Sequence, residues 1–135
     1  MSNSVIVVLE KTDTGYSAYC DLLPGCVATG DDINDVQSKF KEAAEFHLEG
    51  LKANGYNIPK EFKTDFQFEF KLDLEVFFEW FSGVMTKSGV ARITNMNQRL
   101  ISQYANGLKK PSPKQLRKIE DALHSFGEDL LQVRF

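Results

Sequence analysis

The sequence has no long apolar run, few cysteines and, over one long stretch, no acidic residue. No apolar run in the 135-residue sequence approaches the ~18 consecutive apolar residues of a membrane-spanning helix. We therefore expect no membrane partner. The first residues, MSNSVIVVLEK, lack a basic segment and a cleavage site, which leads us to expect a cytoplasmic protein. Cys20 and Cys26 match no metal-binding pattern. In a cytoplasmic protein their simplest role is as reduced packing residues.

The two halves of the chain carry opposite net charge. Residues 1–72 carry seven Lys and Arg against twelve Asp and Glu, a net charge of −5, whereas residues 73–135 carry nine against seven, a net charge of +2. Between Lys87 and Lys118 there are eight basic residues and no acidic one. The overall charge of −3 therefore conceals two opposite fields, each able to steer a different partner. A solvated face on a helical domain is the alternative interpretation of the basic stretch.

The pattern of the first half predicts a β-β-β-α-β order. SVIVVLE (Ser4–Glu10) is β-branched and nearly all apolar, which is typical of a strand covered on both faces. YSAYCDL and CVATG are the next expected strands, separated by the turn residues LPG. DFQFEFKL alternates phenylalanine with polar residues, which predicts a strand with one solvated face.

Between the third and fourth expected strands lies a long amphipathic segment. Asp32 is placed to cap a helix whose apolar stripe recurs at helical spacing, and Asp35 lies near the positive end of that helix. Asn54 and Gly55 predict its end. The members of the stripe are Val36, Phe40, Ala43, Ala44, His47, Leu48 and Leu51.

The periodicity changes from two residues to helical spacing near Asp73. Leu74, Phe77, Phe78 and Phe81 follow at i, i+3, i+4 and i+7. No Gly/Ser/Pro-rich stretch marks a flexible linker at this point. We therefore predict two domains, residues 1–72 and 73–135, and an α+β fold class in which an all-α domain follows the β-β-β-α-β domain.

The second half contains the pattern of a helix-turn-helix. KSGVARIT and QRLISQYANG predict two short helices joined through NMN, with apolar residues where crossing helices contact each other. Asn95 occupies the turn position that requires a left-handed backbone, for which Asn is the next best residue after Gly. Ser112 and Pro113 predict the start of a supporting helix marked by Leu116, Ile119 and Leu123.

Several side chains at the start of the second helix are suited to DNA. The start of such a helix enters the major groove, where paired donors and acceptors read base edges. We expect lysines near its end to contact phosphates, which fix register without reading sequence. The expected base-reading residues are Asn97, Gln98, Arg99, Ser102 and Gln103, and the expected phosphate contacts are Lys109, Lys110 and Lys114. The alternative is a helical hairpin whose polar face contacts another protein.

The segment SGVARITNMNQRLISQYANGLKKPSPKQLRKIEDAL resembles the Xre/Cro-type helix-turn-helix, particularly in NQRLISQYANGLKKPS. The sequence departs from that pattern at two positions. Asn95 replaces the usual turn glycine, and Thr94 lies where a larger apolar residue is common. The resemblance implies binding to double-stranded operator DNA.

The first half, in GYSAYCDLLPGCVATGDDINDVQSKFKEAAEFHLEGL, resembles the HicB-type antitoxin domain, a fold similar to a trimmed ribonuclease H. Together the two resemblances cover almost the whole chain. They imply an antitoxin that binds and silences a HicA-type RNA-cleaving toxin and represses the shared promoter. An acidic domain is a plausible counter-surface for a protein that grips RNA. Candidate toxin contacts are Asp31, Asp32 and Asp35; the alternative, and the more usual role of such residues, is that of structural cap and loop carboxylates.

Catalytic chemistry finds little support in the sequence. A two-metal nuclease needs carboxylates converging from strand centres, but Glu10 lies at a strand end and Asp21 in a turn. His47 has no ligating partner one helical turn away, and the two cysteines have no visible histidine pairing. We expect no enzyme, no metal and no cofactor. The alternative function is a plain transcription regulator whose first domain senses a small ligand.

We expect a homo-oligomer, at least a dimer, because one helix-turn-helix covers only one half-site of a palindrome. The tail DLLQVRF places Leu131, Val133 and Phe135 at alternating spacing. Such a tail, Leu131–Phe135, pairs across subunits or caps the core of its own domain, and the sequence does not decide between the two.

Overall fold

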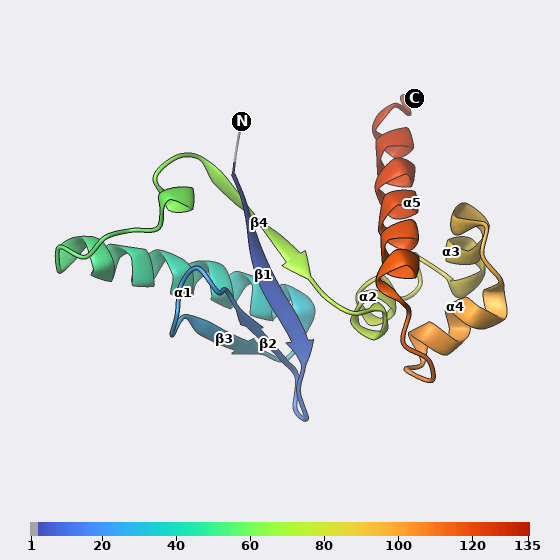
Figure 1. Cartoon of the computed structure of the whole chain (residues 1–135), viewed down its shortest axis with the longest axis horizontal. Coiled ribbons are helices and arrows are strands. Elements are labelled where there is room, and N and C mark those ends of the chain that lie inside the picture. Colours follow the sequence, from blue (N-terminus) through green and yellow to red (C-terminus); the bar gives the residue numbers. More distant parts are fainter. Residues whose placement is uncertain (1–2) are drawn as a thin grey trace. The chain divides into compact units, whose positions relative to one another are not determined.

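The computed structural model describes residues 3–135, which divide into two compact units, one ending at Asp73 and the other spanning Leu74–Phe135. The first contains a four-stranded mixed sheet with a long helix, and the second contains only helices (Figure 1). The predicted α+β fold class is therefore confirmed.

The first unit follows the predicted order of elements. It contains β1 (Asn3–Lys11), β2 (Tyr16–Tyr19), β3 (Val27–Gly30), α1 (Ile33–Ala53), the short 3₁₀ helix η1 (Lys60–Phe62) and β4 (Phe66–Lys71). The sheet order is β3-β2-β1-β4, in which β1 pairs antiparallel with β2 and parallel with β4. The parallel pairing needs a crossover, and α1 provides it.

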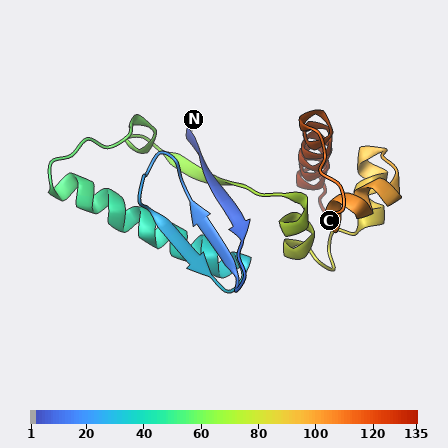
Figure 2. The ribbon, with the colours of Figure 1, turned by 60° about the horizontal axis from the view of Figure 1, so that its bottom comes forward.

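The helix α1 packs on one face of this sheet (Figure 2). Val5, Val7 and Leu9 of β1 are buried on that side, and Phe40 of α1 contacts Phe68 edge-to-face with ring centroids 5.4 Å apart. The expectation that β1 is covered on both faces is wrong, because Ile6 is 47% exposed. Its burial alternates along the strand, so within the first unit the apolar run serves one core face and one uncovered face.

The turn between β2 and β3 is stabilised by a hydrogen bond within it and by a glycine with positive φ. The N–H of Cys26 donates to the carbonyl of Leu23 at 3.0 Å, and Gly25 between them has a φ of 85°. Proline followed by a glycine with positive φ is the signature of a type II turn. Cys20 and Cys26 are buried on either side of it and are not joined by a disulfide.

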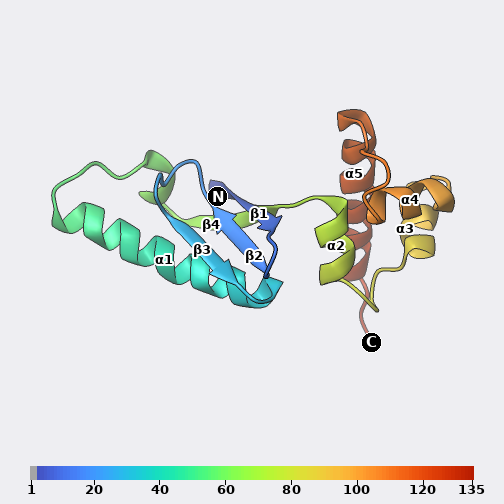
Figure 3. The same ribbon diagram turned by 90° about the horizontal axis from the view of Figure 1, so that it is seen from below.

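The second unit consists of α2 (Leu74–Trp80), α3 (Lys87–Thr94), α4 (Gln98–Ala105) and α5 (Pro113–Leu131), seen from below in Figure 3. The helices α3 and α4 pack on each other, and α5 packs on α3. Their shared core consists of Leu74, Val90, Ala91, Ile101, Tyr104 and Ile119. The predicted apolar residues of the two crossing helices are thus the ones that meet.

The predicted supporting helix, α5, begins where the sequence predicted and continues past the residues that pack on the core of the second unit. The Ser112 hydroxyl accepts the N–H of Gln115 at 3.1 Å, and Pro113 is the first helical residue. At the other end the helix includes Leu131, so the tail is not a strand. Leu131, Val133 and Phe135 are all exposed, which rules out the interpretation that they cap the core of their own domain.

Candidate nucleic-acid and partner interfaces

The turn between α3 and α4 has the backbone geometry that a helix-turn-helix requires. Asn95 has φ 55° and ψ 37°, and it is the only non-glycine residue with positive φ among residues 3–135. Thr86 caps the start of α3 by accepting the N–H of Gly89 at 2.9 Å. The left-handed backbone predicted at Asn95 is therefore confirmed, and it turns the chain directly from α3 into α4.

Thr94, the second departure from the Xre/Cro pattern, is buried at 4% exposure. Its hydroxyl donates to the carbonyl oxygens of Val90 at 2.6 Å and Ala91 at 3.2 Å. A buried hydroxyl with a partner costs little, whereas one without a partner costs the free energy of its desolvation. The polar residue is thus accommodated inside α3, where it packs in the second unit.

The exposed face of α4 presents part of the predicted base-reading set. Gln98 and Arg99 are exposed and Ser102 and Gln103 are half-buried, while Ile101 on the opposite face is buried. Asn97 has a different task. Its Oδ1 accepts the N–H of Arg99 at 2.8 Å and of Leu100 at 3.4 Å, which makes it the cap of α4. Since a bidentate contact with adenine needs the same oxygen, this capping removes Asn97 from the bidentate readers.

The loop after α4 is held in place by hydrogen bonds to that helix. The carbonyl oxygen of Gln103 accepts the N–H of Leu108 at 2.9 Å and of Lys109 at 3.3 Å. Gly107, with a φ of 73°, allows the chain to turn there. Lys109 and Lys110 follow as exposed residues. The predicted phosphate contacts on this loop therefore lie at the end of α4 on a fixed backbone.

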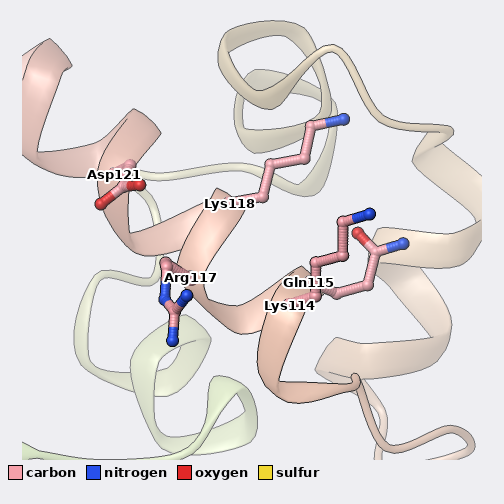
Figure 4. A pocket seen from close by; sticks show the side chains of 5 residues that line it. All are labelled: Lys114, Gln115, Arg117, Lys118 and Asp121. Carbon is pink, nitrogen blue, oxygen red and sulfur yellow. The ribbon is translucent and has the colours of Figure 1, made fainter.

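The third predicted phosphate contact, Lys114, belongs to a larger basic feature. A shallow hollow of about 550 Å³ on α5 is lined by Lys114, Gln115, Arg117, Lys118 and Asp121 (Figure 4). The side chains of Lys114 and Lys118 extend to the same side of the helix, as expected one turn apart. Arg117 and Lys118 were not among the predicted phosphate contacts, although they belong to the acid-free stretch.

The three candidate acidic residues of the first unit converge at the start of α1, where they hold the helix together. Asp32 Oδ1 accepts the N–H of Asp35 at 2.7 Å, which confirms Asp32 as the cap. Asp35 Oδ2 accepts the N–H of Asp31 at 3.1 Å and pairs with Lys39 Nζ at 3.0 Å. The hydrogen bond from Lys39, followed by that from the Asp31 backbone, lowers the pKa of Asp35, and the same carboxylate raises the pKa of Lys39.

Within the first unit, the face of the sheet opposite α1 carries an apolar row that was not predicted from the sequence. Val8 of β1 is paired with Tyr19 of β2, and Tyr19 is paired with Val27 of β3, so these side chains form a row across three strands. Glu10 lies beside the row, 3.5 Å from the Tyr19 hydroxyl, and its charge raises the pKa of that hydroxyl. Val27 is 59% exposed. Side chains of a strand point alternately to its two faces, which could have indicated this row. Because nearly every residue of β1 is apolar, however, the sequence does not distinguish the buried face from the exposed one.

Within residues 3–135, no group of three or more His, Cys, Asp and Glu side chains is arranged to hold a metal ion. In the same part of the chain, no helix combines the length and apolarity needed to cross a bilayer.

The chain is similar to proteins of a known family. The family described as "HicB_like antitoxin of bacterial toxin-antitoxin system" matches residues 5–74. A UPF0150 protein of Synechocystis sp. is 34% identical over 59 residues, which are 44% of this chain and 75% of that protein. A UPF0150 protein of Helicobacter pylori is 38% identical over 47 residues, 35% of this chain and 65% of that protein.

A third relative is an uncharacterized 14.9 kDa protein from the rep-hol intergenic region of Haemophilus phage HP1. It is 33% identical over 54 residues, which are 40% of this chain and 41% of the phage protein. The family match covers more than half of the chain and includes β1, the Pro24-Gly25 turn, the capped start of α1 and β4. This chain therefore belongs to the HicB-like antitoxin family of bacterial toxin–antitoxin systems.

Proposed function

We propose that the chain is a cytoplasmic antitoxin that binds and occludes a HicA-type RNA-cleaving toxin and represses its own promoter. In this proposal the first domain, residues 1–72, neutralises the toxin, and the second, residues 73–135, binds operator DNA. The observation that carries the proposal is the family match over residues 5–74, followed in the same chain by two short helices joined through a left-handed Asn95. No catalytic step is required, because occlusion alone silences the toxin.

The DNA-binding part of the proposal is supported by the exposed polar start of α4. Gln98 and Arg99 are exposed where a recognition helix faces the major groove, and Ser102 and Gln103 extend the same polar surface. Lys109, Lys110 and Lys114 provide positive charge around it for phosphates. In this assignment Asn97 contributes by capping α4. Two copies of the chain would read the two halves of a palindromic operator.

The toxin-binding part is supported by the charge and the apolar row of the first unit. Residues 1–72 carry a net charge of −5, and Val8, Tyr19 and Val27 form an apolar row next to Glu10. A cationic, RNA-gripping protein is complementary to such a surface. Asp31 lines a hollow with Thr29 of β3 and Lys39 of α1, beside the start of that helix. Asp32 and Asp35 would add negative potential there while they stabilise α1.

A ligand-sensing regulator is the alternative function. The hollow lined by Thr12, Thr14, Tyr16, Thr29, Gly30, Asp31 and Lys39 has a volume of about 200 Å³. Pockets for small ligands are typically ~300 Å³ or larger and mostly apolar. This hollow is smaller and its lining is largely polar, which favours the antitoxin over the regulator.

Co-expression with a small basic HicA-type toxin tests the proposal. We expect the full chain to rescue growth and to co-purify with the toxin, and the Glu10→Lys variant to rescue less well, because it places a positive charge beside the apolar row. Glu49→Lys, at an exposed position of α1, is the matched control and should rescue like the native chain. If neither growth nor a complex is recovered with the native chain, the proposed toxin binding is wrong.

A further inference from the structure

The two cysteines of the chain lie opposite each other just beyond the end of the β2–β3 ladder. Tyr19 is paired with Val27 in the antiparallel register, so the next opposed pair along the two strands is Cys20 and Cys26. Both cysteines are buried, at 3% and 4% exposure. Ala18, two residues before Cys20, is buried as well, as expected for side chains that alternate along a strand. The two thiols therefore point to the same, covered face of the sheet.

The backbone brings this pair within the range of a disulfide. The N–H of Cys26 donates to the carbonyl of Leu23 at 3.0 Å, so it is not spent on a ladder hydrogen bond to Cys20. In a non-hydrogen-bonded pair of an antiparallel ladder the Cα atoms are about 4.5 Å apart, and a disulfide needs roughly 4.4–6.8 Å. Burial raises the pKa of the Cys26 thiol and the charge of Cys20 adds to it, so the two thiols are close enough to interact.

We propose that Cys20 and Cys26 are a site of reversible oxidation, at which a peroxide closes a cross-strand disulfide that locks the β2–β3 hairpin. One thiolate attacks hydrogen peroxide and becomes a sulfenic acid, and the other thiol displaces water from it to form the S–S bond. The two thiols together lose two electrons and two protons, and the peroxide is reduced to two molecules of water. Two molecules of glutathione reverse the step and leave as their own disulfide. In cytoplasmic proteins a disulfide that forms is usually transient and redox-sensing.

Burial makes this a slow response. The thiolate is the reactive form, and both buried thiols are shielded from an oxidant while the pKa of Cys26 is raised. Oxidation therefore has to await opening of the turn between the two strands. Such opening is local, because Asp21, Pro24 and Gly25 of this turn are exposed and β3 is an edge strand of the sheet. The site responds to a sustained oxidant and is insensitive to a brief one.

The lock would act directly on part of the apolar row described above. Tyr19 and Val27, which belong to that row, are the ladder pair adjacent to the two cysteines. A disulfide between Cys20 and Cys26 holds the strands together at this end, so the backbone of the row opens less often. The oxidation itself goes beyond the proposed function, because it requires neither toxin nor DNA.

Treatment of the purified full chain with hydrogen peroxide under native conditions tests the chemistry. We expect the intact mass to fall by about 2 Da, both thiols to become unavailable for alkylation, and dithiothreitol to restore them. The chain has only these two cysteines, so the assignment is unambiguous. Cys20→Ala and Cys26→Ala are the matched controls, and neither should show this loss of mass. A native chain that gains oxygen, forms linked dimers or stays unchanged after prolonged exposure overturns the proposal.

Equilibration with mixtures of reduced and oxidised glutathione tests the geometry without any variant. A disulfide that fits the native register is favoured by folding, so the effective concentration of the thiol pair should be roughly tenfold or more higher in the folded chain than in concentrated urea. An equal or lower value in the folded chain would show that the register does not suit the bond. Amide hydrogen exchange of residues 16–30 should slow on oxidation while that of α4 stays the same, and unchanged exchange in the hairpin would rule out the lock. Oxidation that proceeds as expected in a chain that binds no toxin would count against the proposed function alone.

Discussion

The hydroxyl of Thr94 donates a hydrogen bond of 2.6 Å to the carbonyl oxygen of Val90, one turn earlier in α3. Because that carbonyl also accepts a backbone N–H within the helix, replacing Thr94 by Val leaves no buried polar group unpaired. We expect Thr94→Val to change the free energy of unfolding by less than ~1 kcal/mol. Thr94→Ser keeps the hydroxyl but removes a buried methyl group and should destabilise by about 1 kcal/mol. Urea unfolding of both variants decides whether the hydroxyl or the methyl matters. Equal losses in both would contradict this account.

Gly30 lies where β3 passes directly under the start of α1. A Cβ atom at this position would be 2.6 Å from the backbone nitrogen of Val36 and 2.8 Å from its Cα, and neither can move without shifting the helix. We therefore expect Gly30→Ala to destabilise the chain by about 1–3 kcal/mol in chemical unfolding.

Gly50 provides the matched control for Gly30. It lies inside α1, and a Cβ there meets no atom within 4 Å. Gly50→Ala should therefore stabilise the chain by about 0.5–1 kcal/mol, because alanine loses less entropy in a helix. A loss of stability in Gly50→Ala would mean that α1 is packed against something at this point.

Features that depend on a few neighbouring residues were predictable from the sequence. Asp32 and Ser112 cap their helices and Asn95 adopts the left-handed backbone, because each of these roles is set by residues within one turn. The β-β-β-α-β order followed from the change between strand and helix periodicity. Because these features depend on residues close together in the sequence, they can be predicted without knowledge of the tertiary packing.

Features that depend on distant packing were not predictable. The apolar run of β1 does not say which of its faces is covered, so the uncovered Val8–Tyr19–Val27 row was missed. Asn97 illustrates a second limit, since one amide oxygen can cap a helix or read a base, and the bond that it makes depends on the folded structure. The alternating tail left open whether it pairs across subunits or caps its own domain, and the helix α5 extends into it as far as Leu131.

The ion pair between Asp35 and Lys39 should make the stability of the first unit depend on pH. Because the Lys39 hydrogen bond and the Asp31 N–H lower the pKa of Asp35, the unfolded state binds more protons than the folded state in acid, and stability rises with pH. The stabilisation is complete above the ordinary carboxyl pKa of about 4 and is lost as the pH falls through the lower folded value.

Asp35→Asn isolates this contribution. The variant should be less stable than the native chain at pH 7, and the difference should shrink as the pH is lowered below about 4, because the native carboxylate then becomes protonated as well. Unfolding in urea between pH 3 and pH 7 measures it. Glu45→Gln, at an exposed position on the same helix, is the control. A difference that stays constant over this pH range would show that Asp35 acts without its charge.

Arg99 and Lys110 should affect DNA binding in different ways, because one faces base edges and the other faces phosphates in the proposed complex. Arg99→Ala should cost about 1–3 kcal/mol and relax preference at one base position, since an arginine reads guanine through two hydrogen bonds. Lys110→Ala should weaken binding to all sequences and reduce the slope of log affinity against log salt by about 1. Selection of operators from a random duplex library, followed by titration at several salt concentrations, separates the two effects.

Thr14→Ala, in a turn of the first unit, is a control that should change neither quantity. If Arg99→Ala and Lys110→Ala both leave affinity and salt slope unchanged, α4 is not the recognition helix, and the basic second half serves a protein partner instead.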